Sequence, residues 1–319
     1  MAEATVAERE ASRSGVRPAQ PEKRDYPLDA TGVAVSLLCS AFWAGNTIAI
    51  KICVPAIPAF ACAGLRFFLV LPFIWAVCRF SGQPLRTPRG WLAALLCSAF
   101  LNFLQIGTFT LGTSLTHAGR ASVLINVHPL VVVPLSCWLL GEPVRWRTAL
   151  GAVVAVVGVA VMFVESWAAV EGLLLGDFIV LTSGLTLGVY IVLQKLWLRR
   201  IPQYTFLFWS LALSVPFFGI VAWALEPRDY RIDMSVAAAL AYQVLVVSGV
   251  AFSLWIWLLS RYPAGPLAVL GLCTPVFGVL FGWLLRGEPL TVWLLLGCAL
   301  LVFGLYLVVQ PSEAHSFDR

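Results

Sequence analysis

The stretch that decides the fold occurs twice: residues 129–143 read Pro-Leu-Val-Val-Val-Pro-Leu-Ser-Cys-Trp-Leu-Leu-Gly-Glu-Pro, and residues 275–289 read Pro-Val-Phe-Gly-Val-Leu-Phe-Gly-Trp-Leu-Leu-Arg-Gly-Glu-Pro. Both run from a proline through an apolar segment to Gly-Glu-Pro, and they lie 146 residues apart. A pattern that recurs at a fixed offset indicates a duplicated structural unit.

The match continues on both sides of the two stretches. Small residues recur at the same offset of 146: Ala118-Gly119 with Ala264-Gly265, Gly151 with Gly297, and Gly158 with Gly304. The starts of the two copies align at an offset of 144: Gly32 with Gly176, and Lys51 with Lys195. We therefore predict two copies of one unit.

The composition indicates a membrane protein. Of the 319 residues, 60% are hydrophobic and 12% are charged, and the mean hydropathy is +0.90; soluble domains have about 45–50% apolar and about 25% charged residues. This argues against a cytosolic enzyme, a secreted disulfide scaffold or a nucleic-acid-binding protein, so we expect the lipid bilayer and no nucleic acid as a partner. The eight cysteines are scattered without a CxxC pair. We therefore expect neither a metal site nor a cofactor.

Apolar segments of about 20 residues, about 30 Å as a helix, match the hydrocarbon thickness of a bilayer. They are too long and too apolar for the strands of a barrel, so we expect helices. We predict ten spans: 31–50, 57–78, 91–111, 118–140, 148–165, 173–194, 204–225, 236–259, 264–285 and 291–310.

The cationic residues predict the orientation. If the N-terminus is inside, 15 Lys and Arg fall on inside segments and 5 on outside loops, which by the positive-inside rule puts both termini in the cytoplasm. We expect a disordered tail at 1–30, one five-helix repeat at 31–165, the second at 172–310 and a short tail at 311–319. Because five is odd, the second repeat enters the membrane from the opposite side. Inverted repeats are typical of secondary transporters.

The sequence resembles the EamA-type drug/metabolite transporters. The resemblance rests on Phe42-Trp43-Ala44-Gly45-Asn46-Thr47-Ile48-Ala49-Ile50-Lys51, on Leu65-Arg66-Phe67, on Gly176-Asp177 and on the two Pro-to-Gly-Glu-Pro stretches. It covers about residues 31–310, although Ala44 stands where many relatives carry Gly. It implies a ten-helix carrier of the cell inner membrane that exports amino acids or related metabolites. It also implies a central cavity lined mainly by helices 1, 3, 4, 6, 8 and 9.

Arg66 lies nine residues into its predicted span. A charge inside the membrane costs free energy, so we expect an arginine at this position to have a structural or functional role. One interpretation is an anchor for a substrate carboxylate, which a guanidinium binds with two hydrogen bonds. The other is a structural arginine that caps carbonyl groups of a neighbouring helix or extends towards the surface.

His128 precedes Pro129, which frees a backbone carbonyl one turn earlier. His128 could bind substrate or carry a proton, or it could be a neutral core histidine bonded to that carbonyl. Pro129 and Pro275 are predicted hinges, because matched interruptions in two repeats indicate the centre of a transporter.

Other polar and aromatic side chains inside the spans either line the cavity or join helices by hydrogen bonds and packing. Together with Arg66 and His128, the predicted substrate-binding set comprises Trp43, Asn46, Asn102, Gln105, Asn126, Thr186, Tyr190, Gln194, Trp255 and Thr274.

We therefore predict a secondary transporter of small organic molecules that works by alternating access, with no catalytic residues. The alternatives are an intramembrane enzyme and a membrane receptor or scaffold that does not transport. We interpret Glu142 and Glu288 as ordering their turns or meeting the N-terminus of the next helix. The paired glycines favour close helix contact, either within a half or between the subunits of a homodimer.

Overall fold

The computed structural model describes residues 26–86, 90–116, 118–142, 146–162, 164, 175–227, 229–286 and 291–309. This described part is helical and contains no strand. Its elements are α2 (Ala30–Cys53), α3 (Ala59–Phe80), α4 (Leu92–Leu115), α5 (Ala118–Ile125), α6 (His128–Leu140), α7 (Trp146–Met162), α9 (Leu175–Leu198), α10 (Gln203–Leu225), α11 (Met234–Tyr242), the π-helix η1 (Gln243–Ala251), α12 (Phe252–Leu259), α13 (Ala264–Leu270), the 3₁₀ turn η2 (Gly271–Cys273), α14 (Thr274–Arg286) and α15 (Val292–Val309).

These elements form the expected ten spans. Eight stretches are long and apolar enough to cross a membrane, and the shorter apolar helices α7 and α15 complete the set. The predicted tails, apart from 26–30, lie outside the described residues, as does the junction at 165–174. The fold is a polytopic membrane protein with two five-helix repeats of inverted topology.

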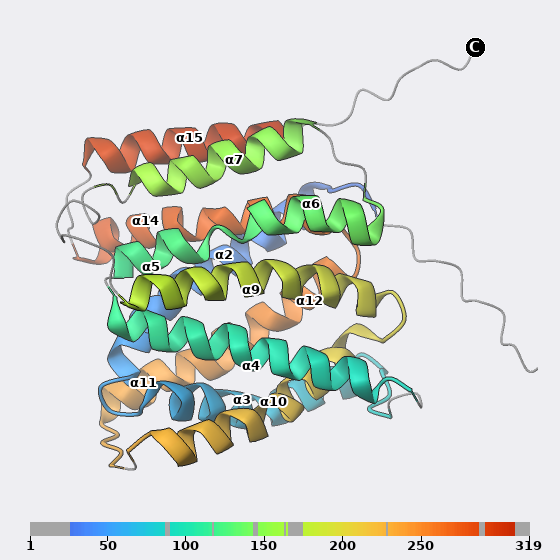
Figure 1. Ribbon diagram of the computed structural model, residues 1–319, viewed down its shortest axis with the longest axis vertical. Helices are drawn as coiled ribbons and strands as arrows, with labels where there is room; N and C mark the ends of the chain where they lie inside the picture. The colour runs from blue at the N-terminus through green and yellow to red at the C-terminus, as the bar shows by residue number, and fades with distance from the viewer. Residues whose placement is uncertain are drawn as a thin grey trace, which may run out of the picture.

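The first helix of each repeat packs against the other repeat. In the first, α2 contacts α11, η1 and α14; in the second, α9 contacts α4 and α6. Helix α2 thus contacts spans 8 and 9, and α9 contacts spans 3 and 4. A two-fold relation between the halves requires these matching contacts. In Figure 1 the helices lie side by side, with α7 and α15 along the top edge.

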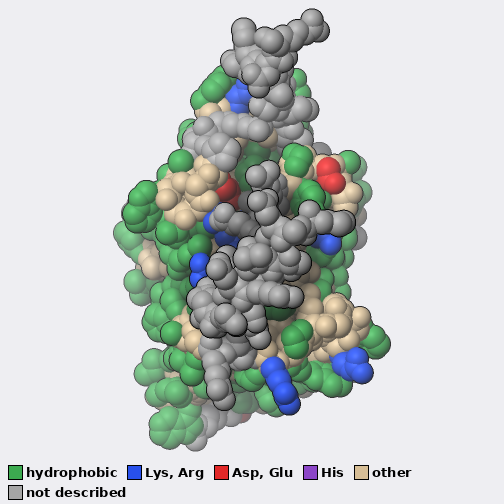
Figure 2. Space-filling view, turned by 90° about the vertical axis from the view of Figure 1, so that its right-hand side faces the viewer, with side chains coloured by type: hydrophobic (Ala, Val, Ile, Leu, Met, Phe, Trp, Pro, Cys, Tyr) green, Lys and Arg blue, Asp and Glu red, His purple; other side chains and the backbone are tan. Residues whose placement is uncertain are grey.

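We call the end of the bundle where α2 begins the near end, and the end where α2 finishes the far end. The near end lies at the right of Figure 1. Figure 2 views the molecule from the near end, where several Lys and Arg side chains lie between hydrophobic side chains.

Three spans are not single α-helices. Span 4 is broken between α5 and α6, span 8 passes through η1, and span 9 passes through η2. The breaks in spans 4 and 9 lie just before Pro129 and Pro275, because a proline cannot donate the hydrogen bond to the carbonyl four residues back. The sequence analysis predicted these two breaks but not the π-helix.

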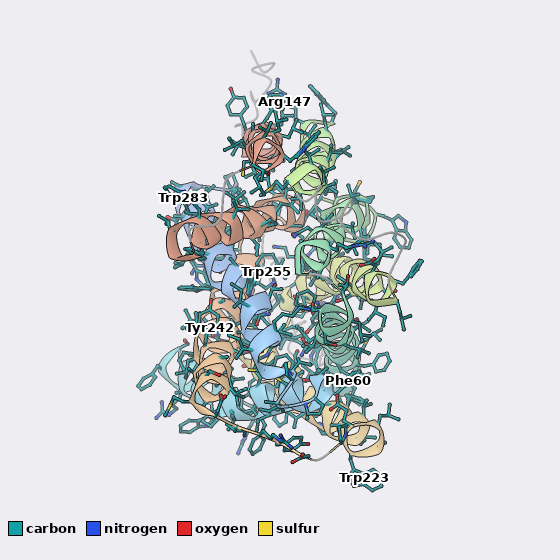
Figure 3. The ribbon with its side chains drawn as sticks, turned by 90° about the vertical axis from the view of Figure 1, so that its left-hand side faces the viewer. Phe60, Arg147, Trp223, Tyr242, Trp255 and Trp283 are labelled. Atoms are coloured by element: carbon teal, nitrogen blue, oxygen red, sulfur yellow. The ribbon has the colours of Figure 1, made fainter. Side chains whose placement is uncertain are left out.

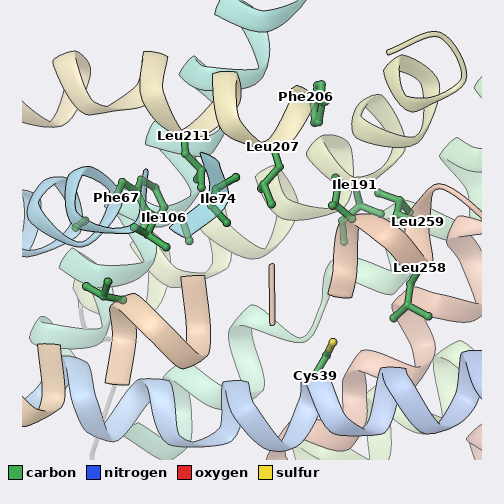
Figure 4. Packing of buried hydrophobic residues seen from close by; sticks show 14 of the residues in the cluster. Cys39, Phe67, Ile74, Ile106, Ile191, Phe206, Leu207, Leu211, Leu258 and Leu259 are labelled. Carbon is green, nitrogen blue, oxygen red and sulfur yellow. The ribbon is translucent and has the colours of Figure 1, made fainter. Parts of the chain in front are cut away.

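Large apolar side chains both fill the core and cover the surface. Phe67, Ile106, Ile191 and other buried residues form one cluster between the helices (Figure 4). Trp138 is 81% exposed, which suits a chain whose outer surface meets lipid rather than water.

The paired glycines join the two halves within one chain. A Cβ on Gly151 would lie 2.6 Å from the Gly304 carbonyl oxygen, and one on Gly158 would lie 2.8 Å from that of Gly297. Only glycine allows α7 and α15 to approach so closely. This is a third arrangement, neither within a half nor between subunits, so these glycines give no support to a homodimer.

Candidate functional site

The two helix breaks are built alike. The Nδ1 atom of His128 lies 3.1 Å from the Ile125 carbonyl oxygen, and the hydroxyl of Thr274 donates to the Gly271 carbonyl at 2.8 Å. Each carbonyl is the one that the following proline leaves without its usual helical partner. Because a carbonyl only accepts, the hydrogen lies on Nδ1 of His128. His128 and Thr274 therefore hold equivalent places in the two repeats.

The two breaks also meet. A Cβ on Gly271 would lie 3.7 Å from Nε2 of His128, so the imidazole of the first repeat lies against the 3₁₀ turn of the second. Asn126, in the link between α5 and α6, is buried. The predicted residues Asn126, His128 and Thr274 and the two predicted hinges thus belong to two breaks that meet between the halves.

Arg66 forms a second polar cluster with Asn46 and Gln243. Its Nη1 atom lies 3.5 Å from Oδ1 of Asn46 and 3.4 Å from Oε1 of Gln243. Its guanidinium carbon lies 4.8 Å from the centre of the Phe67 ring. Arg66 is the eighth residue of α3, so the cluster lies about 10 Å from the far end, closer to that end than the sequence suggested. Gln243 was not among the predicted residues, and its partner Arg66 comes from the other repeat.

The predicted tryptophans lie together. The rings of Trp43 and Trp255 are 5.4 Å apart in an edge-to-face arrangement. The Tyr242 hydroxyl donates to the Phe42 carbonyl at 2.5 Å, which joins α11 to α2. Figure 3 looks at the far end and labels Tyr242 and Trp255 beside α2.

Three predicted residues bond to serines where α4 meets α9 and α10. Asn102 donates to Ser214 at 3.4 Å, Gln105 donates to Ser183 at 3.2 Å, and the Tyr190 and Ser98 hydroxyls are 3.1 Å apart. Interhelical hydrogen bonds of this kind join helices in a membrane. Sequence reasoning did not single out the serines, because a serine in an apolar helix is a common residue.

The remaining two predicted residues lie on α9. The hydroxyl of Thr186 donates to the Thr182 carbonyl of its own helix at 2.8 Å and is partly exposed, whereas Gln194 is buried.

A polar contact that we call the far-end clasp joins the repeats. Lys51 donates to the Thr116 carbonyl at 2.8 Å, and the Thr116 hydroxyl donates to Asp177 at 2.5 Å. Arg120 forms an ion pair with Asp177 at 2.8 Å, and both side chains are at most 2% exposed. Arg120 is one of the five cationic residues assigned above to outside loops, but it lies in α5 and is buried.

The near end has an equivalent contact, the near-end clasp. Lys195 donates to the Tyr262 carbonyl at 2.8 Å, and the Tyr262 hydroxyl donates to Asp29 at 2.8 Å. Lys51 and Lys195 align at the offset of 144, and Thr116 and Tyr262 at the offset of 146. Asp177 and Asp29 each stand at the first turn or N-cap of the first helix in a repeat. The lysine alignment was the available signal for both clasps.

Carboxylates and an amide also cap helices across the repeats. Glu142 accepts from the backbone N–H groups of Ala264 at 2.8 Å and Gly265 at 3.3 Å. Glu226 accepts from Phe60 at 2.7 Å, and Gln83 accepts from Tyr204 at 2.8 Å. Glu142 does meet a helix N-terminus, where an anion is favoured, but that helix belongs to the other repeat and is not the next one. Glu288 lies outside the described residues.

No group of three or more His, Cys, Asp or Glu side chains suited to a metal ion occurs in the part of the chain that the structure describes. Besides the charged groups of the two clasps, the buried polar groups between the halves are amides, hydroxyls, the imidazole of His128 and the guanidinium of Arg66. Such groups bind by hydrogen bonds and charge.

The described residues form ten spans in two inverted repeats, with paired breaks and with clasps at both ends. This arrangement defines a membrane protein of the transporter class. The EamA-like transporter family model matches the chain twice, over residues 30–164 and 174–310. The chain belongs to this family and is a membrane transporter.

Similar proteins support this assignment. The uncharacterized transporter YoaV of Bacillus subtilis is 23% identical over 83% of this chain and 92% of its own. A probable amino-acid metabolite efflux pump of Salmonella typhimurium is 26% identical over 86% of this chain and 93% of its own. A protein known by a crystal structure shares the fold with a TM-score of 0.75, at 20% identity over 87% of this chain and 96% of that one.

Proposed function

We propose that the chain is a secondary carrier of the cell inner membrane that exports small organic metabolites, amino acids or similar compounds, by alternating access. Two relatives named as probable amino-acid metabolite efflux pumps support the substrate class. The multi-pass fold supports the location, and the charge bias supports cytoplasmic termini.

The observation that carries the proposal is the pair of matched helix breaks. His128 and Thr274 take up the carbonyl groups that Pro129 and Pro275 leave free, so each span can bend there without an unsatisfied backbone group. Because the breaks meet between inverted repeats, bending one half relative to the other would change access at one end and then at the other.

The clasps support the same cycle. Both ends of the bundle are held by bonds between the repeats, so substrate entry at either end requires the clasp there to open while the other stays closed. The proposal places the substrate between the two halves. The substrate-binding residues named in the sequence analysis remain predictions.

Counterflow in proteoliposomes tests the function. Vesicles with purified protein and an unlabelled amino acid inside should accumulate the labelled compound, and uptake should saturate. Absence of flux across a broad panel of amino acids and related metabolites would contradict the proposal.

The hinges can be tested in the same assay. Pro129→Ala or Pro275→Ala restores a helical hydrogen bond, so we expect about tenfold slower exchange or more, about 1.4 kcal/mol on the barrier. Pro134→Ala is the matched control, because Pro134 lies in the same helix, α6, but aligns with Leu280 and has no partner in the second repeat. Equal rates for P129A and P134A would refute the hinge assignment.

Reporter fusions test the orientation. A reporter after Arg319 should be cytoplasmic, and one placed in the loop 226–235 should lie outside. The opposite result would reverse the predicted direction of the chain in the membrane.

A further inference from the structure

The guanidinium of Arg66 is held in place from one side and left without partners on the other. Nη1 contacts the amide oxygens of Asn46 and Gln243, and the Phe67 ring lies beside the guanidinium carbon. The Nε and Nη2 atoms are buried and have no hydrogen-bond partner, although the side chain is only 1% exposed.

The two unpartnered nitrogens form one edge of the guanidinium. The N–H groups of Nε and Nη2 point the same way and match the spacing of two carboxylate oxygens. The neutral amides of Asn46 and Gln243 fix the plane of the group without neutralising its charge. The geometry is that of an oriented anion receptor.

Burying an arginine without a counter-ion costs free energy. The far-end clasp contains a buried arginine that does have a counter-ion. Arg120 is equally buried, but Asp177 lies 2.8 Å from it. Asp177 is the only acidic side chain among the buried residues of the described part of the chain, and it is already engaged. The negative charge that Arg66 lacks is therefore available from a ligand.

We propose that the Nε–Nη2 edge of Arg66 binds the carboxylate of the transported compound through two hydrogen bonds. This inference rests on the proposed function and names its substrate class, small monocarboxylic acids. The cluster has no acidic residue to hold an amino group, so the carboxylate is the group recognised. Hydroxy acids and deaminated analogues should therefore bind like the amino acids.

The surroundings also select the rest of the ligand. Trp43 lies one helical turn from Asn46 on the same side of α2, and its ring packs against Trp255. A carboxylate on Arg66 with an apolar side chain directed along α2 would meet this aromatic pair. Since Arg66 lies near the far end and is closed off, the ligand would reach it when the far-end clasp opens.

Matched ligand pairs test the proposal on the purified full chain. The probes are leucine with leucinamide, and 4-methylpentanoate with its primary amide. Both acids should raise the thermal midpoint and bind with a measurable Kd, and both amides should bind at least about tenfold more weakly, because an amide cannot replace the charged acceptor. Binding of acid and amide alike, or no binding of any acid at millimolar concentration, would overturn the proposal.

Two variants locate the effect. Arg66→Lys keeps the charge but loses the paired N–H groups, so acid binding should fall at least about tenfold. Asn46→Asp puts a carboxylate beside Nη1 and should weaken acid binding in a chain that still folds. Arg231→Lys is the control, because Arg231 pairs with Asp229 on the surface. Acid binding unchanged in both R66K and N46D would overturn the proposal.

The counterflow assay separates this inference from the proposed function. If R66K and N46D still exchange amino acids with the wild-type preference for acids, the chain is a carrier but Arg66 is not its carboxylate site. If the wild-type protein exchanges none of the metabolites, the carrier function itself is wrong, whatever binds at Arg66.

Discussion

In the far-end and near-end clasps, the lysine and the residue whose carbonyl it binds occupy matching positions of the duplicated unit, but the aspartates do not. Both contain a lysine that donates to a backbone carbonyl at 2.8 Å. At the far end the chain continues through the small Thr116 to a buried Asp177–Arg120 ion pair. At the near end the larger Tyr262 reaches the exposed Asp29, and Pro266 occupies the place equivalent to Arg120.

Comparing the two clasps shows that the lysine contact is the part common to both repeats. The lysine satisfies a carbonyl at the end of a span and favours that helix terminus in both copies. At the far end the contact includes the buried Asp177–Arg120 ion pair, so opening that end separates two buried charges. In the proposed cycle we expect this cost to favour a closed far end at rest.

The largest effect is expected from Asp177→Asn. It leaves Arg120 buried with a neutral partner, which should destabilise the protein by about 3–5 kcal/mol. Thermal unfolding in detergent measures this loss. Asp229→Asn is the matched control, since Asp229 and Arg231 are 78% and 84% exposed and a surface pair contributes about 0–1 kcal/mol. Equal midpoints for D177N and D229N would mean that the buried ion pair contributes no more to stability than the exposed one.

A smaller effect is expected from the two lysines. Lys51→Met and Lys195→Met each remove one charged hydrogen bond, at about 1–3 kcal/mol, and K195M should cost more because Lys195 is only 2% exposed.

The two lysine variants should also open opposite ends. A cysteine at Ala44→Cys, in the middle of α2, should react with an impermeant maleimide from the far end in K51M and from the near end in K195M. The same labelling pattern in both variants would contradict the assignment of one clasp to each end.

The smallest effect is expected from Tyr262→Phe, and it should depend on pH. The Gly32 N–H first and then the Tyr262 hydroxyl hold the pKa of Asp29 below its ordinary value of 3.8. A lowered pKa stabilises the folded chain above the unfolded value and loses this contribution as pH falls through the folded pKa. The difference in unfolding midpoint between Y262F and the wild type should therefore shrink below about pH 4. A constant difference from pH 7 to pH 3 would mean that the phenol does not act through Asp29.

Much of the fold could be predicted because it depends on features local in the chain. The ten apolar segments follow from length and composition, and the breaks follow from Pro129 and Pro275. The odd number of spans per copy, together with the repeat, predicts the inversion. The contacts across the repeats could not be predicted. Glu142 and Ala264, for example, are 122 residues apart, and no local pattern around either residue indicates its partner.

The candidate site shows the same division. Sequence reasoning identified Arg66, Asn46 and His128 as polar groups that need a reason to lie inside a membrane. It could not say that Gln243 contacts Arg66, because that outcome depends on which helix faces turn towards one another. It gave the bond from His128 to the carbonyl that Pro129 frees as one of two interpretations, and the structure shows this bond.

The sequence by itself determined the membrane environment, the number of helices and their inversion, because hydrocarbon thickness, backbone hydrogen bonding and the duplicated pattern act along the chain. The tertiary structure alone decided which charges are paired. A guanidinium such as Arg66 or Arg120 is compensated or left open only by what the other repeat places beside it, within the few ångströms over which hydrogen bonds form.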